Sequence, residues 1–300
     1  MGILNFGSMN IDYVYKVSHF VKPGETISSE QMSTVCGGKG LNQSIALARC
    51  GAQVYHAGKV GFKDGTILLD KLSSSGVDIT YIEQYDCPSG HSIIQVDESG
   101  QNCIILYGGA NNFLTKEQVD KVLSHFGSGD ILVLQNEINI LGYIIQKSYE
   151  RGMKIALNPS PISKNIFNLP FEKIAYLFVN EVEARELTGI EDSDDQLEQL
   201  SAKFPNSTII LTCGNGGAIV KSNGIIYRHG TYDVPVVDTS AAGDTFTGFF
   251  IASVSAKKEI PECLELASKA ASICVSQKGT SDSIPSFSEV ISANIGLKAC

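Results

Sequence analysis

Short apolar runs and helical patterns alternate along the second half of the chain. The runs are almost continuously hydrophobic, which is typical of strands that are buried on both faces of a parallel sheet. Strands are predicted at residues 131–135, 155–158, 176–179 and 208–212. Helices are predicted between and after them, at residues 139–151, 181–189 and 194–204. This alternation predicts a doubly wound α/β fold, with a mostly parallel sheet flanked by helices.

The first third of the chain follows a different pattern. Residues 92–96 and 102–107 flank the turn-rich sequence DESGQ and predict an antiparallel hairpin. Further strands are predicted at residues 13–17 and 29–36. We interpret these pieces as a small β-sheet lid over the ligand edge of the main sheet. The lid segments run approximately over residues 12–17, 29–36 and 90–108. No linker-like stretch separates them from the rest, so residues 1–300 are expected to form a single domain.

Composition and charge argue against several classes of protein. The chain has 300 residues, of which 43% are hydrophobic and 18% charged, so it can bury a large core and is not intrinsically disordered. The net charge of −9 argues against nucleic acid or an anionic membrane as the main partner. The N-terminal sequence lacks a secretory pattern, and no apolar run approaches the length of a membrane span.

The cysteines are scattered along the chain without a CxxC pair. They occupy positions 36, 50, 87, 103, 213, 263, 274 and 300. Several lie in apolar runs, such as Cys103 in QNCIILY and Cys274 in ASICVSQ. This distribution favours reduced, structural thiols in a cytoplasmic protein over a disulfide framework or a zinc site.

The strongest chemical signal is DTSAAGDTFTGFF at residues 238–250. Small residues precede an apolar run with helical spacing, so free backbone N–H groups at this helix start can hold an anion. Asp244 lies at the same helix start. It can act as a simple N-terminal helix charge, or it can take a proton from a hydroxyl that attacks a bound phosphate. The spacing alone leaves both interpretations open.

A second glycine-rich helix start is CGGKGLNQSIALARCGA at residues 36–52. Its loop lets the backbone approach a polar ligand, and Lys39 and Asn42 add hydrogen-bond donors. A glycine-rich helix start without a ligand is the alternative. The sequence does not match the P-loop pattern GxxxxGK[ST], and no GxGxxG follows the first strand, which argues against a dinucleotide-binding oxidoreductase.

Two further segments follow predicted strands. NEVEARELTG at residues 180–189 places Asn180 and Glu183 at the carboxyl end of a strand, where open α/β sheets bind ligands. Charge alternation on a solvated helix is the alternative explanation. TCGNGGAIV at residues 212–220 contains a glycine turn that can wrap a nucleotide or form a tight hairpin.

In order along nearly the whole chain, these segments resemble the ribokinase (PfkB) family of ATP-dependent sugar kinases. The segments are GSMNID, GGKGLNQ, NPSP, NEVEARELTG, DTSAAGDTFTG and SQKGTSDSIPS. The combination of GGKGxNQ with DTxAAGDTF is highly specific. The resemblance implies a ribokinase-like fold. It also implies transfer of the γ-phosphoryl group of MgATP to the 5-hydroxyl of D-ribose, which gives D-ribose 5-phosphate and ADP.

The resemblance also assigns roles to single residues. Asp244 is expected to be the catalytic base, and backbone N–H groups of Ala241, Ala242, Gly243 and Asp244 to form the anion hole. The residues expected to bind the sugar are Asn10, Asp12, Gly38, Lys39, Gly40, Asn42, Glu137 and Asp244. Those expected to bind ATP are Asn180, Glu183, Thr212, Gly214, Gly216, Gly217, Gly243 and Ser268.

Two ions and a partner follow from the same resemblance. Mg²⁺ is expected to arrive with ATP, and K⁺ to stiffen the anion-hole loop through mostly backbone oxygens. The expected K⁺ ligands are Asp238, Ser240, Cys274, Gln277, Gly279 and Ser283. The lid is expected to close over the sugar and to pair with a second subunit in a homodimer.

Two alternatives to a ribose kinase remain. A related kinase of the family could act on 2-deoxyribose, a nucleoside or another furanose. A catalytically silent sugar-binding regulator would show a broken Gly-Asp pair or a missing anion-hole glycine. Gly243 and Asp244 are both in place, so the sequence favours an enzyme.

Overall fold

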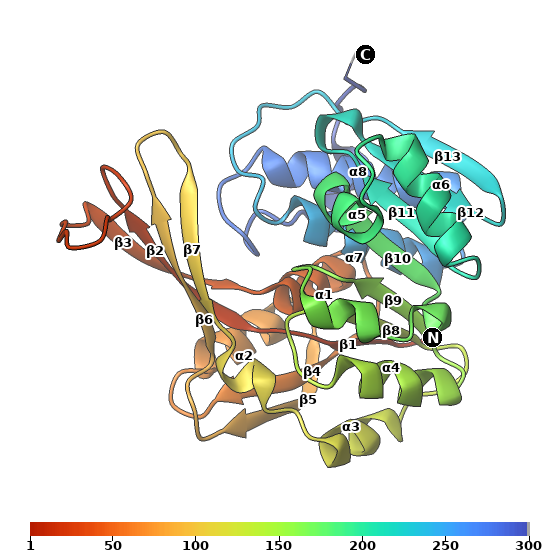
Figure 1. The fold of residues 1–300 in the computed structure, drawn as a ribbon, viewed down its shortest axis with the longest axis horizontal. Helices are drawn as coiled ribbons and strands as arrows, with labels where there is room; N and C mark the ends of the chain where they lie inside the picture. The colour runs from red at the N-terminus through yellow and green to blue at the C-terminus, as the bar shows by residue number, and fades with distance from the viewer. Residues whose placement is uncertain (299–300) are drawn as a thin grey trace.

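The computed structural model describes residues 1–298 and shows a large sheet between two layers of helices (Figure 1). In this part of the chain the large sheet has nine strands, in the order β13-β12-β11-β10-β9-β8-β1-β4-β5. Their bounds are β1 Ile3–Phe6, β4 Val54–Gly61, β5 Asp78–Tyr85, β8 Ile131–Gln135, β9 Lys154–Asn158, β10 Tyr176–Asn180, β11 Thr208–Thr212, β12 Ala218–Ser222 and β13 Ile225–His229. Neighbouring strands are parallel except at β11–β12 and β12–β13. The predicted doubly wound, mostly parallel sheet is therefore confirmed.

Helices cover both faces of this sheet. One layer contains α1 Lys39–Arg49, α2 Thr66–Ser74, α7 Ala242–Ser255, α8 Ile260–Val275 and α9 Phe287–Ser292. The other contains α3 Lys116–Leu123, α4 Leu141–Glu150, α5 Glu181–Thr188 and α6 Ser193–Lys203. Successive strand residues point to opposite faces, so Ile131 and Val133 pack against the first layer and Leu132 and Leu134 against the second. No helix within residues 1–298 is both long and apolar enough to cross a membrane.

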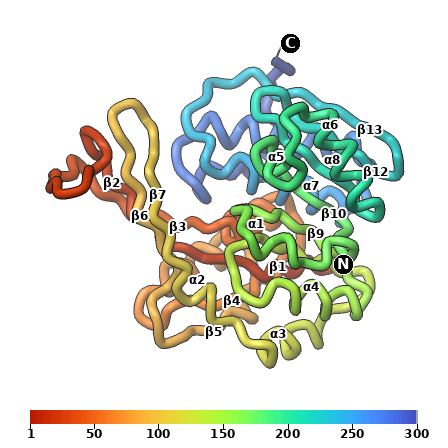
Figure 2. Tube along the Cα trace, viewed as in Figure 1, coloured from red at the N-terminus to blue at the C-terminus, as the bar shows by residue number. Residues whose placement is uncertain are grey.

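A smaller sheet projects from one side of the molecule, as Figure 2 shows for its two long arms. Within the described residues it has four strands in the order β3-β2-β6-β7. Their bounds are β2 Asn10–Lys16, β3 Gln31–Gly37, β6 Gly90–Val96 and β7 Asn102–Tyr107. The β6–β7 pair is the antiparallel hairpin expected around DESGQ, whereas β2 and β6 run parallel. We call this small sheet the lid.

Several element boundaries differ from the sequence prediction. The helix expected from residue 139 begins at residue 141, because Ile140 has a φ of 52°, in the left-handed region where a right-handed helix cannot continue. The strand expected from residue 29 begins at residue 31. The sequence analysis sets no bounds for strands β4, β5 and β13, because glycine and polar residues interrupt β4, and β5 and β13 are partly exposed.

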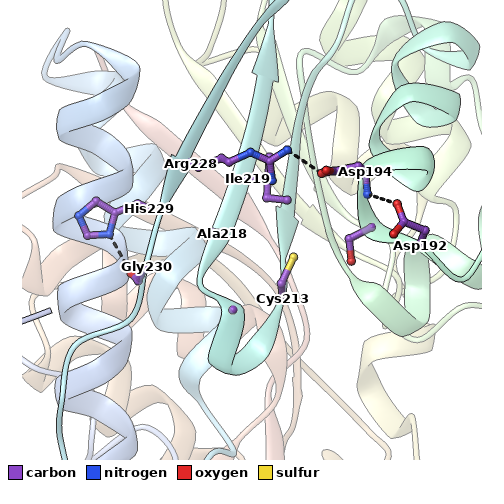
Figure 3. Close-up of a pocket in the computed structure, with 10 residues that line it drawn as sticks. Asp192, Asp194, Cys213, Ala218, Ile219, Arg228, His229 and Gly230 are labelled. Atoms are coloured by element: carbon purple, nitrogen blue, oxygen red, sulfur yellow. Dashed lines mark hydrogen bonds and ion pairs between the residues drawn. The ribbon is translucent and has the colours of Figure 1, made fainter. Parts of the chain in front are cut away.

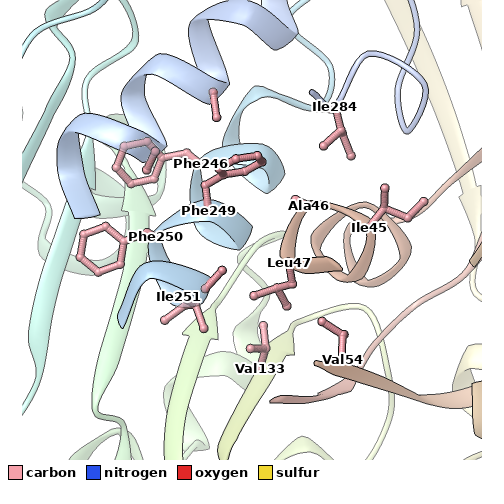
Figure 4. Packing of buried hydrophobic residues seen from close by; sticks show 14 of the residues in the cluster. Ile45, Ala46, Leu47, Val54, Val133, Phe246, Phe249, Phe250, Ile251 and Ile284 are labelled. Carbon is pink, nitrogen blue, oxygen red and sulfur yellow. The ribbon is translucent and has the colours of Figure 1, made fainter. Parts of the chain in front are cut away.

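Helices α1 and α7 pack closely against each other and hold the two glycine-rich segments together. Gly248 of α7 lies against Ala46 and Leu47 of α1, and residues of both helices belong to one buried cluster (Figure 4). On another side of α7, Phe250 packs against Phe246 and against Phe178 of β10. Gly248 permits this approach, because a Cβ at that position would lie 2.3 Å from the Ala46 Cβ. The spacing of these two helices therefore depends on a residue without a side chain.

We predict that Gly248→Ala destabilises the protein by about 1–3 kcal/mol, the usual cost of overpacking a dense core. Urea denaturation measures this change. The matched control is Gly142→Ala on α4, where a Cβ would meet nothing closer than 3.8 Å and alanine is the better helix former. The control variant should be as stable as the unaltered protein or more stable. Equal effects of the two substitutions would contradict this account of α1 and α7.

Candidate active site

The starts of α1 and α7 meet the carboxyl ends of strands β9, β10 and β11 at one cavity of about 120 Å³. Pockets that hold drug-sized ligands are usually about 300 Å³ or larger, so the enclosed part suits a phosphoryl group and a hydroxyl better than a whole nucleotide. The lining residues are Lys39, Asn158, Ser160, Phe178, Val179, Asn180, Glu183, Thr212, Ser240, Gly243, Asp244 and Thr247. Seven of them are predicted site residues from distant parts of the sequence.

Asp244 is a buried carboxylate, with 8% of its surface exposed. Asn42 Nδ2 donates to its Oδ2 at 3.0 Å, and Gln43 Nε2 donates to its Oδ1 at 2.9 Å. Burial raises the pKa of Asp244 to about 6, while the positive charge of Lys39 and the two amide hydrogen bonds act in the opposite direction. A carboxylate with this pKa is ionised near neutral pH and is a stronger proton acceptor than an ordinary aspartate.

The start of helix α7 presents unpaired backbone N–H groups to the cavity. Its N-terminal residue Ala241 has no side chain that can cap the helix, and no other side chain within residues 1–298 does so. Ala242 N–H donates to the Thr239 carbonyl at 3.3 Å, so one of the four N–H groups of the predicted anion hole already has an acceptor. The N–H groups of Gly243 and Asp244 have no acceptor within the helix. With the helix dipole, they favour an anion at this point.

The start of helix α1 is held by side chains from the sheet. Glu137 Oε2 accepts a hydrogen bond from the Lys39 N–H at 3.0 Å and another from the Ser8 hydroxyl. Gly40 N–H donates to Ser8 Oγ at 3.2 Å. Gly38 precedes the helix with a φ of 92° and has no side chain to cap it, so Glu137 and Ser8 supply the acceptors instead. These contacts bring Lys39, Gly40 and Glu137 together, three of the residues that the resemblance assigns to the sugar site.

Lys39 keeps its positive charge in this setting. Its Nζ lies 3.8 Å from Glu137 Oε1. Burial lowers the pKa of the Lys39 ammonium, but three nearby carboxylates outweigh burial and raise it above its ordinary value. They belong to Asp244, Glu137 and Glu183. The cavity therefore contains a fixed cation between acidic groups.

The lid contributes Asp12 and Asn10 through strand β2. Asp12 accepts a hydrogen bond from the Ser92 hydroxyl of β6, the residue paired with it across the sheet. Burial raises the pKa of Asp12 to about 6; the Ser92 hydrogen bond lowers it and the charge of Glu137 raises it further. Asn10 Oδ1 accepts from Asn111 Nδ2 at 2.8 Å. Asp12 and Asn10 both lie on β2 of the lid, and neither is among the residues that line the cavity of about 120 Å³.

The predicted ATP-binding residues divide into two groups. Asn180, Glu183, Thr212 and Gly243 line the cavity with Asp244. Asn180 and Glu183 form a capping box at the start of α5, with Asn180 Oδ1 accepting from Glu183 N–H at 2.8 Å and Glu183 Oε2 accepting from Asn180 N–H at 3.0 Å. This arrangement fixes the Glu183 carboxylate at the cavity wall.

The second group does not line this cavity. Gly214, Gly216 and Gly217 form the turn between β11 and β12, which is the tight antiparallel connection that the sequence left open. Ser268 is buried on α8, and its Oγ has no hydrogen-bond partner among residues 1–298.

The residues predicted to hold K⁺ gather around one loop. Asp238 Oδ1 accepts from Ser240 N–H at 3.0 Å and Asp238 Oδ2 accepts from Gly279 N–H at 3.1 Å, so this carboxylate joins two segments. Cys274 Sγ lies 3.2 Å from Ser283 Oγ. Gln277 is exposed, and its N–H donates to the Cys274 carbonyl at 3.1 Å. Carboxylate, hydroxyl and backbone carbonyl oxygens suit a hard cation, whereas the Cys274 thiol does not, so Cys274 could act only through its carbonyl.

A larger hollow, of about 490 Å³, lies beside the start of α6 and strands β12 and β13 (Figure 3). Arg228 Nη2 and Asp194 Oδ1 form an ion pair of 2.6 Å across it. Of the predicted site residues only Gly216 borders this hollow. Because Asp244 and Lys39 lie elsewhere, the smaller cavity is the candidate for catalysis.

Sequence reasoning missed several residues of the site. Gln43 belongs to the GGKGLNQ segment and Ser8 to GSMNID, so membership of these segments was the sequence signal that could have identified both residues. Asn158 and Ser160 of NPSP also line the cavity. Ser92 had no local signal, because only the pairing of β2 with β6 brings it to Asp12.

Comparisons with known proteins agree with this geometry. A family model described as pfkB family carbohydrate kinase matches residues 2–286. The ribokinase of Haemophilus influenzae is 33% identical over 296 residues, which cover 95% of each chain. A deoxyribokinase of Salmonella typhi is 31% identical over 307 residues, which cover 98% of this chain and 100% of the relative.

A solved structure shows the same fold over the same length. The Arabidopsis thaliana ribokinase complexed with ribose and ATP aligns with a TM-score of 0.87 at 30% sequence identity. The alignment covers 96% of this chain and 97% of that one. The family model and these relatives span nearly all of the residues that build the sheet, the lid and the cavity. The chain belongs to the pfkB family of carbohydrate kinases.

Proposed function

We propose that this kinase transfers the γ-phosphoryl group of MgATP to the 5-hydroxyl of D-ribose, giving D-ribose 5-phosphate and ADP, with residues 1–300 acting as one kinase domain. The observation that carries the proposal is the position of Asp244. Its buried, proton-accepting carboxylate lies in the same cavity as the uncapped start of α7. A base and an anion site this close together are what in-line transfer to a hydroxyl requires.

In the proposed mechanism, Asp244 accepts the proton of the sugar hydroxyl as its oxygen attacks the γ-phosphorus. A new O–P bond forms, the bond between the β- and γ-phosphates breaks, and ADP leaves with its electron pair. The N–H groups of Gly243 and Asp244 face the negative charge of the transferred group. Lys39 adds a positive charge whose raised pKa keeps it protonated.

The sugar is proposed to bind between the lid and the start of α1. Asp12 and Glu137 supply carboxylate acceptors for hydroxyl groups, and Lys39 supplies a donor. Asn42 Oδ1 is buried without a hydrogen-bond partner among residues 1–298, although Asn42 Nδ2 is bound to Asp244. A sugar hydroxyl close to the base would satisfy this oxygen, which supports a polyhydroxylated substrate.

The ATP phosphates are proposed to lie along Asn180, Glu183 and Thr212. Carboxylate oxygens such as those of Glu183 suit Mg²⁺, which accompanies ATP and neutralises charge on its phosphates. The turn at 214–217 and Ser268 are proposed to bind the adenosine part outside the enclosed cavity. Ser268 Oγ is buried without a hydrogen-bond partner among residues 1–298, and a contact with the nucleotide would satisfy it.

K⁺ is proposed to bind the loop that Asp238 joins, with oxygen donors from Asp238, Ser240, Gly279 and Ser283. Its chemistry is to hold these oxygens in fixed positions. Because Ser240 also lines the cavity, ordering this loop would order the approach to the α7 start. The proposal rests on the oxygen-rich donor set, not on a cluster of acidic or cysteine ligands.

A homodimer through the lid is proposed from its exposed apolar surface. All six residues of the edge strand β7 are exposed, and Ile105 exposes 61% of its surface. Ile104, Leu106 and Met32 are also exposed on the same small sheet. An apolar edge strand of this kind is stabilised by pairing with another strand, and a second copy of the lid supplies one.

The main alternative is a kinase of the same family that prefers another furanose. The deoxyribokinase relative, at 31% identity, gives 2-deoxyribose a specific basis. The two sugars differ by one hydroxyl. In a pocket that contains several acceptors, ribose would therefore make one hydrogen bond more than 2-deoxyribose.

A sugar panel is the direct test of the proposed activity. ATP-dependent ADP release should be highest with ribose and should rise when K⁺ is added. A site that hydrogen-bonds the 2-hydroxyl loses affinity when its partner is missing, so 2-deoxyribose should have a kcat/KM lower by at least about tenfold. Equal or better turnover of 2-deoxyribose or of a nucleoside would contradict the ribose assignment. No turnover on the whole panel, with ATP still bound, would favour the regulator.

Asp244→Asn should lower kcat by about two to four orders of magnitude, because the amide cannot accept the hydroxyl proton. ATP affinity should change little, since the backbone groups at the start of α7 remain. Steady-state kinetics and equilibrium ATP binding measure the two effects. Asn180→Ala is the comparison variant, and it should weaken ATP binding instead. Near-normal turnover of Asp244→Asn would show that another group is the base.

A further inference from the structure

A continuous series of buried polar side chains runs from Asp244 into the centre of the large sheet. Gln43 Nε2 donates to Asp244 Oδ1 at 2.9 Å. Gln135 Nε2 donates to Gln43 Oε1 at 2.7 Å and to Asn5 Oδ1 at 3.1 Å. Gln43, Gln135 and Asn5 are all completely buried. None of these three side chains is in reach of solvent, so their polar atoms depend on hydrogen bonds within the protein. Gln135 Oε1 is the exception, because it has no hydrogen-bond partner among residues 1–298.

The series continues from Asn5 to a buried histidine. Asn5 Nδ2 donates to Ser44 Oγ and to the Gly40 carbonyl, both at 2.8 Å. Ser44 Oγ lies 2.8 Å from His56 Nδ1, and His56 Nε2 lies 3.2 Å from the Gly7 carbonyl. Burial lowers the pKa of His56 to about 4, so this imidazole is neutral at physiological pH.

The strand register places these side chains on one face. Asn5 is paired with His56 of β4 on one side and with Val133 of β8 on the other. Gln135 lies two residues after Val133 and therefore points to the same face. That face is covered by α1 and α7, which contribute Gln43, Ser44 and Asp244.

The end of the series fixes the direction of every hydrogen bond in it. The Gly7 carbonyl can only accept, so His56 Nε2 carries the proton and His56 Nδ1 accepts from Ser44. Ser44 Oγ then accepts from Asn5 Nδ2, which turns Asn5 Oδ1 toward Gln135. Turning the Gln135 amide over would bring its oxygen against two other acceptor oxygens, those of Asn5 and Gln43. The Gln135 Nε2 is therefore held between them.

We propose that Gln135 is a positioning residue for the phosphoryl transfer: by donating to Gln43 Oε1, it holds the Gln43 amide with its N–H toward Asp244 and so keeps that carboxylate ionised and oriented. The inference rests on the proposed role of Asp244 as the base. Gln135 itself does not line the cavity and is separated from Asp244 by Gln43.

The consequence is a change in pH dependence and not only in rate. A donated hydrogen bond stabilises the ionised form of Asp244, and without Gln135 the Gln43 side chain is free to move away or to turn over. The base then needs a higher pH to lose its proton. Sugar and ATP contacts are untouched, so KM for either substrate stays the same.

Gln135→Met tests this, because methionine has nearly the shape of glutamine without its hydrogen-bonding groups. The acid limb of the kcat/KM profile, which reports the free enzyme and should lie near pH 6 in the unaltered protein, should move up by about one pH unit. Below the limb kcat/KM should then fall about tenfold, and above pH 8 it should approach the unaltered value. Both KM values should stay within about twofold.

Gln118→Met is the matched control. Gln118 is a buried glutamine on α3 whose Nε2 donates to the Gly58 carbonyl at 3.2 Å, outside the series. Its loss should lower the melting temperature without moving the acid limb. A uniform loss of kcat/KM at all pH values in Gln135→Met, or an unmoved limb, would overturn the proposal.

Gln43→Met removes the direct donor and serves if Gln135→Met does not fold. It should move the limb in the same direction and at least as far. The double variant should move it no further than Gln43→Met alone, because Gln135 acts through Gln43. Additive shifts would show that Gln135 acts by another route.

All variants are assayed with the sugar that the panel identifies, and Asp244→Asn is measured beside them. Near-normal turnover of Asp244→Asn would reject the proposed base, whereas an inactive Asp244→Asn with an unmoved limb in Gln43→Met and Gln135→Met would reject only the positioning role.

Discussion

The rest of the structure depends on a buried carboxylate at the uncapped start of a helix. Asp244 loses contact with water at the start of α7, where the free N–H groups attract an anion. Burial alone would raise the pKa of such a carboxyl further, so that it stayed protonated at a higher pH. The amides of Asn42 and Gln43, together with the charge of Lys39, reduce that effect, and all three belong to α1. The site therefore works only if α1 and α7 stay in contact.

The large sheet and the core serve this contact. Gly248 lets α7 approach Ala46 of α1, and Phe250 of α7 packs against Phe178 of β10 in the sheet. Beneath them, the register of β1, β4 and β8 brings polar residues to the same face as α1. Glu137 and Ser8 accept hydrogen bonds from the Lys39 and Gly40 N–H groups and so fix the start of α1. Packing and polar contacts thus converge on one short segment, residues 37–43.

The sequence predicts much of this arrangement because some signals are local. Continuous apolar runs reveal β8, β10 and β11, whose residues are buried on both faces. The glycine-rich segments reveal the two helix starts and thus Lys39 and Asp244. Strand β4 escapes prediction, because His56, Lys59 and its glycines break the apolar pattern.

Other features are set by tertiary contacts and have no local signal. The hydrogen bond between Gln43 and Gln135 joins residues 92 positions apart, and the Ser92–Asp12 contact joins residues 80 positions apart. Ala242 is a predicted anion-hole residue whose N–H is instead engaged by Thr239, which depends on how the loop enters the helix. Only the folded chain shows which backbone N–H groups lack an acceptor and which already donate a hydrogen bond.

Titration of Asp244 itself tests the central claim most directly. Carboxyl-carbon NMR of protein labelled at aspartate, without substrate, would follow its ionisation, and the Asp244→Asn variant would identify its signal. The account predicts a pKa of about 6, because burial outweighs the charge of Lys39 and the two amides. A pKa near the ordinary value of 3.8 would contradict it, since the carboxylate would then be as weak a base as an aspartate in water.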